Sequence, residues 1–255
     1  MNLDTLGRKK GKSKIIMLTA YDYQIAKILD EIGIDLILVG DSLNMVVLGN
    51  KDTKSATMES MLYHTKAVAR GAKNTPVVGD MPIGSDKTVK DALRNAKRFI
   101  ECGANGVKIE GNKSDIVRAL IDEGIPVMGH VGLLPQTADA YRVKGKTQKG
   151  AIRIHQDAKA LDSLGVFSLV LECIPNKLAK RITETVNTVT IGIGAGKHCD
   201  GQVLVINDML GLDPVFKPKY LKRYADLNET IKEAVGRFIQ EVQGEVYPDK
   251  KHTYH

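Results

Sequence analysis

The sequence LILVGDS at residues 36–42 decides how the rest of the chain is interpreted. Four apolar residues in a row, followed at once by glycine, are typical of a short strand that is buried on both faces in a parallel sheet. Asp41 and Ser42 come where such a strand ends. Because parallel α/β folds bind their ligands at the carboxyl ends of the strands, both side chains are candidate site residues.

Four more apolar runs end in the same way. They are PVVGD at residues 76–80, VKIEG at 107–111, VMGH at 127–130 and LVLE at 169–172. One such coincidence would mean little, but five predict that the polar side chains at the strand ends converge on one rim. The side chains expected there are Asp41, Asp80, Lys108, Glu110, His130 and Glu172.

Apolar runs of strand length alternate with segments of helical periodicity along the 255 residues. The predicted strands are 15–20, 36–39, 76–78, 106–110, 126–128, 168–171, 188–193 and 203–206. The predicted helices are 23–32, 57–70, 88–102, 114–121, 150–164, 175–184 and 219–243. The gap at 194–201 is too short for more than a turn of helix.

Eight strands in this alternation indicate a (β/α)8 TIM barrel. An open doubly wound sheet is the alternative, but the acids are spread over many strand ends rather than gathered at one switch point. The whole chain, residues 1–255, is predicted to be a single barrel domain with a C-terminal helical region. A polar and basic lead-in at 1–14 is expected on its outside. The long connection at 43–56 is a candidate functional loop, and residues 131–148 are expected to form a long loop that contains glycine and Pro135.

Composition excludes several classes of protein. Hydrophobic residues make up 43% of the chain, which is enough for a large core, and no apolar run approaches the roughly 20 residues of a membrane span. The N-terminus lacks the layout of a signal peptide, so we expect a soluble cytoplasmic protein. Cys102, Cys173 and Cys199 are too far apart for a metal motif or a dense disulfide framework and are expected to be free thiols.

The net charge of +7 raises the alternative of a nucleic-acid-binding protein. The lysines are scattered, however, and the absence of tryptophan with only 5% aromatic residues leaves little to stack on bases. No nucleic-acid partner is therefore expected. A positive field can still attract an anionic small substrate.

Two chemical interpretations compete for each candidate. Asp41 and Asp80 both follow Val-Gly and suit a hard divalent cation, whereas an aspartate at a strand end can also cap a turn. The repeated phrase favours the metal. Lys108 and Glu110 are two apart on a strand and so point the same way, either toward a ligand or into a structural ion pair.

The remaining candidates are less specific. Glu172 is a plausible general base, and His130 is a ligand orienter, an acid or a satisfied core histidine. GIGAG at residues 192–196 resembles a phosphate-binding loop, but no clear helix and no GKS or GKT follow it. Close backbone packing at a barrel rim explains these glycines equally well.

Seven short phrases occur in one order along the chain. They are TAYD at 19–22, VGDS at 39–42, GDMP at 79–82, VKIEG at 107–111, GHVGLLPQ at 129–136, GIGAG at 192–196 and CDGQ at 199–202. In this combination the chain resembles the ketopantoate hydroxymethyltransferase family from roughly Leu18 to Tyr247. The resemblance implies a Mg²⁺-dependent (β/α)8 barrel that assembles as a homodecamer, a pentamer of dimers. The implied reaction moves a one-carbon unit from 5,10-methylenetetrahydrofolate to 3-methyl-2-oxobutanoate, giving ketopantoate for pantothenate and coenzyme A.

The resemblance also implies roles for individual residues. Metal ligands are Asp41 and Asp80, with Glu110 reaching the metal through water; the keto acid is held by Asp41, Ser42, Asp80 and Lys108; Glu172 is the catalytic base, and Lys108 and His130 assist. No folate-binding residues can be assigned. The enzyme alternative is a related Mg²⁺-dependent 2-oxo-acid aldolase or lyase, which needs no folate, but the catalytic cysteine loop of such lyases is absent from the sequence.

Overall fold

A computed structural model describes residues 3–254, apart from the side chain of Asp4. The chain divides into two compact units, the first ending at Val205 and the second beginning at Ile206. The prediction of one domain over residues 1–255 stays a prediction. No helix in the described part of the chain is long and apolar enough to cross a membrane.

The first unit is a closed barrel of parallel strands. The strands are β1 (Ile15–Thr19), β2 (Leu36–Val39), β3 (Val77–Asp80), β4 (Gly106–Glu110), β5 (Val127–Gly132), β6 (Ser168–Glu172), β7 (Val189–Ile193) and β8 (Gly201–Leu204). Each strand pairs with the next in sequence, and β1 pairs with β8, with Ile15 opposite Gly201. The predicted barrel is confirmed and the open sheet is excluded.

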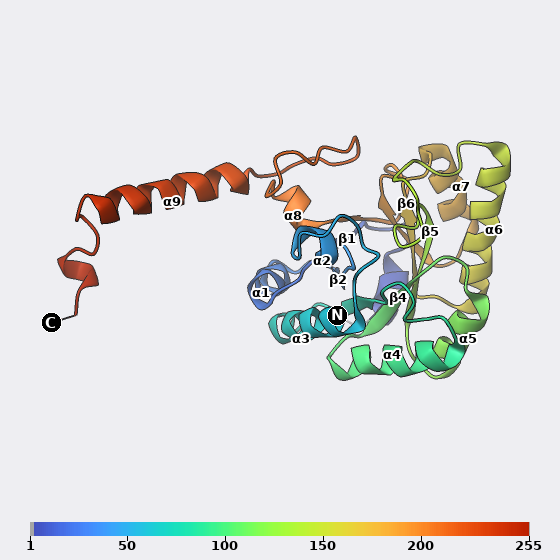
Figure 1. Cartoon of the computed structure of the whole chain (residues 1–255). Coiled ribbons are helices and arrows are strands. Elements are labelled where there is room, and N and C mark those ends of the chain that lie inside the picture. The colour runs from blue at the N-terminus through green and yellow to red at the C-terminus, as the bar shows by residue number, and fades with distance from the viewer. Residues whose placement is uncertain (1–2, 255) are drawn as a thin grey trace. The chain divides into compact units, whose positions relative to one another are not determined.

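Helices surround the strands of this unit (Figure 1). They are α1 (Tyr23–Ile32), α2 (Leu43–Val46), α3 (Met58–Gly71), α4 (Val89–Glu101), α5 (Ser114–Asp122), α6 (Gln148–Leu164) and α7 (Asn176–Thr185). As expected, no helix lies between β7 and β8. The short helix α2 was not predicted; it lies inside the 43–56 connection, which was expected to be irregular throughout.

Local chemistry fixes the ends of these helices. Thr57 caps α3, because its side chain accepts the backbone N–H of Ser60 while the Ser60 hydroxyl contacts the Thr57 N–H in return. Asp22 caps the start of α1, because its carboxylate accepts the N–H of Ile25, and Gly33 caps its end with a φ of 79°. That left-handed conformation suits glycine, which carries no Cβ.

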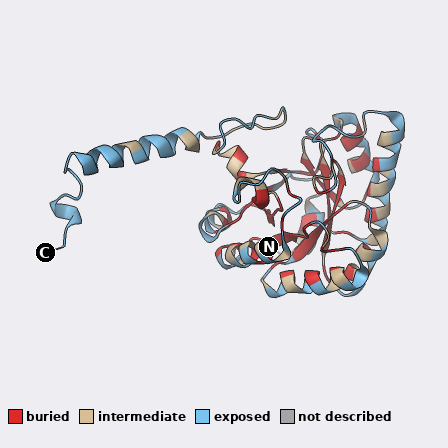
Figure 2. Cartoon of the chain, in the orientation of Figure 1, coloured by how far each residue is buried: buried red, intermediate tan, exposed pale blue. Residues whose placement is uncertain are grey.

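The barrel core is formed mainly by apolar side chains of the strands. Its buried side chains are Leu3, Leu6, Ile15, Met17, Leu36, Leu38, Val78, Met128, Val170, Val189, Ile191 and Val203. Figure 2 shows this burial concentrated in the strands. Leu3 and Leu6 come from a 3-10 helix, η1 (Leu3–Lys9). The expectation of an external lead-in at 1–14 is therefore wrong for these residues, because the two leucines remove apolar surface from water by closing the barrel floor.

The second unit contains α8 (Ile206–Met209), α9 (Leu227–Gln243) and the 3-10 helix η2 (Lys250–His252). The predicted helix at 219–243 starts later than expected, because the Asp226 side chain accepts the N–H of Glu229 and so caps the helix there. The last predicted strand, 203–206, is shifted: β8 covers Gly201–Leu204. Helix α9 buries none of its side chains (Figure 2).

Candidate active site

The polar side chains at the carboxyl ends of the strands continue the inward face of the barrel. Side chains two residues apart on a strand point to the same side. The core residue and the polar residue are paired as Val78 and Asp80, Met128 and His130, and Val170 and Glu172. The predicted rim therefore exists, because the period of a strand carries each apolar core position to a polar one at the top of the barrel.

Asp80 and Lys108 form the closest ion pair of this cluster. The register of β3 and β4 sets the two residues side by side, and Lys108 Nζ donates to Asp80 Oδ1 at 2.8 Å and Oδ2 at 2.7 Å. The pair that the sequence suggested, between Lys108 and Glu110, is longer at 3.9 Å. Burial acts to lower the pKa of Lys108, but the charges of Asp80, Glu110 and Asp41 outweigh it and raise that pKa.

Asp41 lies just beyond β2 and next to Asp80. Its backbone N–H donates to Asp80 Oδ2 at 3.3 Å, and its own carboxyl group is buried. Burial and then the negative charge of Asp80 raise the pKa of Asp41 well above its usual value. Two carboxyl groups thus sit close together in a place where water does not separate their charges.

Gln136 joins two of the acids and had no role in the sequence analysis. Its side-chain Nε2 donates to Asp41 Oδ2 at 3.0 Å and to the carbonyl of Met81 at 2.9 Å, while its backbone N–H donates to Glu110 Oε2 at 3.2 Å. The signal available in the sequence was the long connection at 131–148, which the structure folds back over the rim. Gln136 therefore orients Asp41 and Glu110 together.

His130 stands between two carboxylates. Its Nε2 lies 3.2 Å from Glu172 Oε2 and its Nδ1 lies 3.6 Å from Glu110 Oε1, and neither contact has the geometry of a hydrogen bond. Burial and the Lys108 charge lower the pKa of His130, but Glu110 and Glu172 outweigh them and raise it to about 9. The two carboxylates thus favour the charged form of the imidazole.

Ser42 begins the turn into α2 beside Asp41. Its hydroxyl lies 2.8 Å from the hydroxyl of Tyr21, a residue to which the sequence analysis assigned no role. Tyr21 is buried at the end of β1 and brings the first strand into the site. Every predicted site residue is therefore on this rim, together with Tyr21 and Gln136.

The backbone turns sharply directly after Glu172. Cys173 has a φ of 46°, its N–H donates to the carbonyl of Ile193 at 2.8 Å, and its carbonyl accepts the N–H of Lys144 at 2.9 Å. Such a conformation is uncommon for a residue with a Cβ and is held here by both neighbours. Burial, and then the charge of Glu172, raises the pKa of the Cys173 thiol to about 11, so it is not a thiolate nucleophile at neutral pH.

The glycines at 192–196 are explained by close packing. A Cβ on Gly196, whose φ is 83°, would lie 2.1 Å from Asn176 Oδ1, and one on Gly192 would lie 2.9 Å from Cys199 Sγ. Only glycine fits where side chains approach the backbone this closely. The structure thus favours packing over a phosphate cradle for this stretch.

The donor set fits a hard divalent cation. Among residues 3–254, no group of three or more His, Cys, Asp or Glu side chains is arranged to hold a metal ion by itself. Asp41 and Asp80, however, are adjacent buried carboxyl groups with mutually unfavourable charges, and Glu110 Oε1 has no hydrogen-bond partner. A cation between the two aspartates would relieve their repulsion and leave positions for substrate and water.

The comparisons with known sequences point to one protein family over nearly the full length of this chain. Residues 1–250 match the family described as ketopantoate hydroxymethyltransferase. The chain is 50% identical over 255 residues to the 3-methyl-2-oxobutanoate hydroxymethyltransferase of Syntrophus aciditrophicus (strain SB), with 97% of this chain and 94% of that protein covered. It is 54% identical over 253 residues to the protein of that name from Clostridium kluyveri, with 96% and 90% covered.

Solved structures share the architecture at low sequence identity. Phosphonopyruvate hydrolase superposes with a TM-score of 0.65 at 9% identity, covering 100% of this chain and 92% of that one. A 2,3-dimethylmalate lyase superposes with a TM-score of 0.61 at 14% identity, covering 99% and 91%. At these identities the likeness shows the fold alone.

Proposed function

Because this chain belongs to the ketopantoate hydroxymethyltransferase family, we propose that its barrel rim binds Mg²⁺ and that 5,10-methylenetetrahydrofolate supplies the transferred carbon. The protein is a hydroxymethyltransferase that forms ketopantoate from 3-methyl-2-oxobutanoate in pantothenate biosynthesis. The observation that carries the proposal is the convergence of buried acids, a lysine and a histidine at one end of a barrel of this family.

Asp41 and Asp80 are the proposed direct ligands of Mg²⁺, with Glu110 acting through water. When bound, the metal supplies a Lewis acid that draws electron density from the keto group of the substrate. Gln136 keeps the Asp41 carboxyl group in position through the 3.0 Å hydrogen bond to Oδ2. The second carboxylate, Asp80, is aligned by its two hydrogen bonds from Lys108.

The keto acid is held by Asp41, Ser42, Asp80 and Lys108 in this proposal. Lys108 is positively charged because three acids surround it, and it is almost fully buried at 4% exposure. A fixed positive charge in a site that excludes water stabilises negative charge as it develops on the substrate oxygen. The lysine therefore favours loss of the proton from C3.

Glu172 is the proposed base that takes the C3 proton. It is the more exposed end of the row formed with His130 and Glu110, with 18% of its side chain accessible against 3% for Glu110. A carboxylate at the mouth of the site can meet the substrate. The imidazole of His130, 3.2 Å away, positions the carboxylate of Glu172. The electron-rich C3 then forms a bond to the one-carbon unit, whose two C–N bonds to the folate break. Water supplies the hydroxyl oxygen of ketopantoate, and tetrahydrofolate leaves.

We further propose a cytoplasmic homodecamer, a pentamer of dimers, with no nucleic-acid partner. The support within the chain is the apolar side of α9, where Ile231, Val235 and Phe238 are 49%, 50% and 53% exposed. Exposed apolar patches on a helix favour association with another protein surface. Size-exclusion chromatography with light scattering tests this: ten chains of 27.9 kDa give about 279 kDa, and a monomer would contradict the assembly.

Proton NMR in D₂O tests the reaction itself. We expect the C3 proton of 3-methyl-2-oxobutanoate to exchange when protein and Mg²⁺ are present without folate, and ketopantoate to form when methylenetetrahydrofolate is added. Exchange without any ketopantoate would favour the related 2-oxo-acid lyase. A folded, metal-loaded protein that gives neither exchange nor product would overturn the proposed function.

A further inference from the structure

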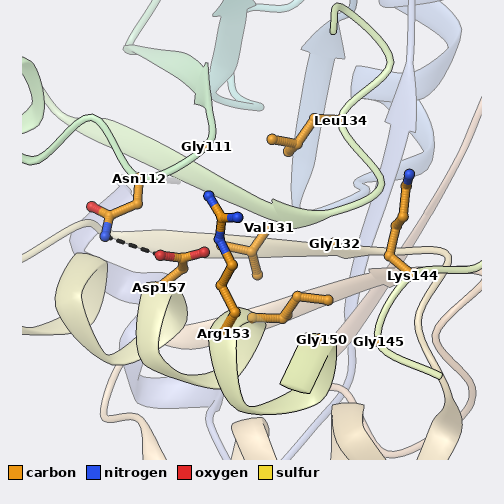
Figure 3. Close-up of a pocket in the computed structure, with 11 residues that line it drawn as sticks. Gly111, Asn112, Val131, Gly132, Leu134, Lys144, Gly145, Gly150, Arg153 and Asp157 are labelled. Carbon is orange, nitrogen blue, oxygen red and sulfur yellow. Dashed lines mark hydrogen bonds between the residues drawn. The ribbon is translucent and has the colours of Figure 1, made fainter. Parts of the chain in front are cut away.

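A cavity of about 560 Å³ lies next to the ends of β4 and β5 (Figure 3). It is lined by Gly111, Asn112, Val131, Gly132, Leu134, Lys144, Gly145, Gly150, Arg153, Ile154 and Asp157. These residues come from the ends of β4 and β5, from the connection that follows β5, and from the first turns of α6. None of them has a role in the site described above.

The cavity shares its wall with the catalytic strands. Gly111 follows Glu110 directly, and its N–H donates to the carbonyl of His130 at 2.9 Å. The connection beyond β5 is held to β6 in the same way, since the N–H of Leu133 donates to the carbonyl of Glu172 at 2.9 Å. A ligand in the cavity therefore lies against the backbone that carries Glu110, His130 and Glu172.

The lining combines apolar surface with positive charge. Val131, Leu134 and Ile154 provide apolar surface, and Lys144 and Arg153 line the same cavity. Arg153 lies between Asp157 and Val131, and Lys144 lies on the other side of the view (Figure 3). A single carboxylate, Asp157, stands at one end, where Asn112 Nδ2 donates to it at 3.1 Å. One negative charge thus faces two positive charges.

The segment that borders the cavity is uniformly basic. Residues 141–153 contain five cations and no acid: Arg142, Lys144, Lys146, Lys149 and Arg153. All five are exposed, and none of them forms an ion pair within the described residues. This arrangement differs from the α5 side of the cavity, where Lys113 is paired with Asp86 at 2.6 Å. The basic segment can therefore accept negative charge from a ligand.

We propose that this cavity binds the p-aminobenzoyl-glutamate half of the folate co-substrate. The aromatic ring packs on the apolar surface, the glutamate carboxylates pair with Lys144 and Arg153, and further glutamates of a polyglutamyl tail run along the basic segment. The geometry is suitable because the reacting methylene lies at the junction of the pterin and the p-aminobenzoyl group. A tail in the cavity leaves that junction beside the rim. The assignment rests on the proposed function, since it requires a folate substrate.

The test compares steady-state kinetics with mono- and triglutamyl methylenetetrahydrofolate. Replacing Lys144 and Arg153 together (Lys144→Met with Arg153→Met) is expected to raise KM for the triglutamate roughly tenfold or more, with little change in kcat, since charge-assisted contacts to the carboxylates are lost. Arg153→Lys keeps the charge and is expected to recover part of the affinity. Asp157→Asn removes the opposing charge and is expected to lower that KM.

Lys159→Met is the matched control, because Lys159 is exposed on the same helix but does not line the cavity. It should leave both KM values unchanged. If the double variant keeps the wild-type KM for the triglutamate, or loses kcat instead, the tail is bound elsewhere and the assignment fails. Wild-type protein that makes no ketopantoate with either folate defeats the proposed function instead, so the two failures are distinct.

Discussion

The two ends of the barrel treat buried charge in opposite ways. At the amino-terminal end, Asp200 accepts from Lys10 Nζ at 2.9 Å, from the N–H of Thr190 at 2.9 Å and from the Thr190 hydroxyl at 3.1 Å. Asp35, just before β2, is paired with Lys9 and accepts the N–H of Ile16 at 2.9 Å. Both of these acids have a cation and a backbone donor as partners.

At the carboxyl-terminal end, the acids outnumber the cations. Asp41, Asp80, Glu110 and Glu172 share Lys108 and His130. Glu110 Oε1 and both nitrogens of His130 lack hydrogen bonds in the structure. This end of the barrel is therefore incomplete by itself.

This difference indicates that one end of the barrel contributes mainly to stability and the other mainly to function. Charges that are fully paired within the chain hold the floor of the barrel together. Charges left partly unpaired raise the energy of the folded protein and favour ligands that complete them. Changes at the floor should thus affect stability, and changes at the rim should affect chemistry.

The largest expected effect is on the rate of C3 proton exchange when Glu172, on the rim, is replaced. In Glu172→Gln the amide cannot take the C3 proton, so exchange in D₂O should fall on the order of a thousandfold, as is typical for loss of a general base. Binding of 3-methyl-2-oxobutanoate, measured by calorimetry with Mg²⁺, should persist. Glu184→Gln is the control, because Glu184 is an exposed carboxylate on α7 with only a 3.7 Å contact to Lys180. Exchange that survives in Glu172→Gln would assign the base to another residue.

The next largest expected effect is on the free energy of unfolding when Asp200, at the amino-terminal end of the barrel, is replaced. Asp200→Ala leaves Lys10 without a charged partner and the N–H of Thr190 without its acceptor. We expect a loss of about 2–4 kcal/mol in the free energy of unfolding. Urea denaturation followed by circular dichroism measures it. Activity per folded molecule should be retained, which is the reverse of the result at Glu172.

The control for the floor is Asp122→Ala, since Asp122 is exposed at the end of α5. It should change the free energy of unfolding by less than about 0.5 kcal/mol. If Asp200→Ala were as stable as wild type, the paired charges at the amino-terminal end would not stabilise the barrel, and the proposed difference between its two ends would be wrong.

Replacing Asp41 is expected to change the free energy of unfolding by a smaller amount and in the opposite direction, toward greater stability. Burial and Asp80 raise the pKa of Asp41, so its ionised form is disfavoured in the folded protein. Its contribution to stability is present at low pH and is lost as pH rises through the raised pKa. Without metal, Asp41→Asn should therefore be about 1 kcal/mol more stable than wild type at neutral pH, while still accepting the bond from Gln136.

Mg²⁺ is expected to change the Tm of wild type and of Asp41→Asn by different amounts. It should raise the Tm of wild type, because a ligand that binds only the folded state stabilises it, and should raise that of Asp41→Asn much less. Chelation with EDTA should return wild type to its metal-free Tm. An equal rise in both proteins would place the metal away from Asp41.

The smallest expected effect is the pH-dependent contribution of Asp30 to the free energy of unfolding. Burial acts to raise the pKa of Asp30, but hydrogen bonds from the backbone of Asn74 and Thr75 outweigh it and lower the pKa to about 2. The stability from this group is present above its ordinary value of 3.8 and is lost as pH falls toward 2. Because Asp30 is partly exposed, we expect only about 1 kcal/mol.

Urea denaturation of wild type and Asp30→Asn at pH 5 and pH 3 measures this contribution. The difference between the two proteins should be larger at pH 5 than at pH 3. A difference that stays constant would mean that the hydrogen bonds of Asp30 do not depend on its charge.

The rim could be predicted because strands have a period of two. That period places Asp80, His130 and Glu172 on the same side as the apolar core residues before them. The same argument named Lys108 and Glu110 as a pair, but the nearer partner of Lys108 is Asp80. Partner choice depends on the register between β3 and β4, which belongs to no single strand.

Contacts from connections could not be predicted in this way. Gln136 reaches Asp41 from 95 positions along the chain, and Lys144 and Arg153 enter the cavity from a loop and a helix that have no strand periodicity. Leu3 and Leu6 were missed for a similar reason, because two leucines in a basic segment do not form a periodic apolar face. Where a loop folds is decided by the surface that it covers.

By itself, then, the sequence determined the number and order of the strands, the residue types at their ends and the family resemblance. These follow from local rules, because burial on both faces selects short apolar runs and helix caps select particular polar residues. The tertiary structure alone decided which charges are paired at the floor, which are left incomplete at the rim, and that a basic cavity adjoins them. The physical reason is that electrostatic energy depends on distance and burial, and both are fixed only when all eight strands have closed into one barrel.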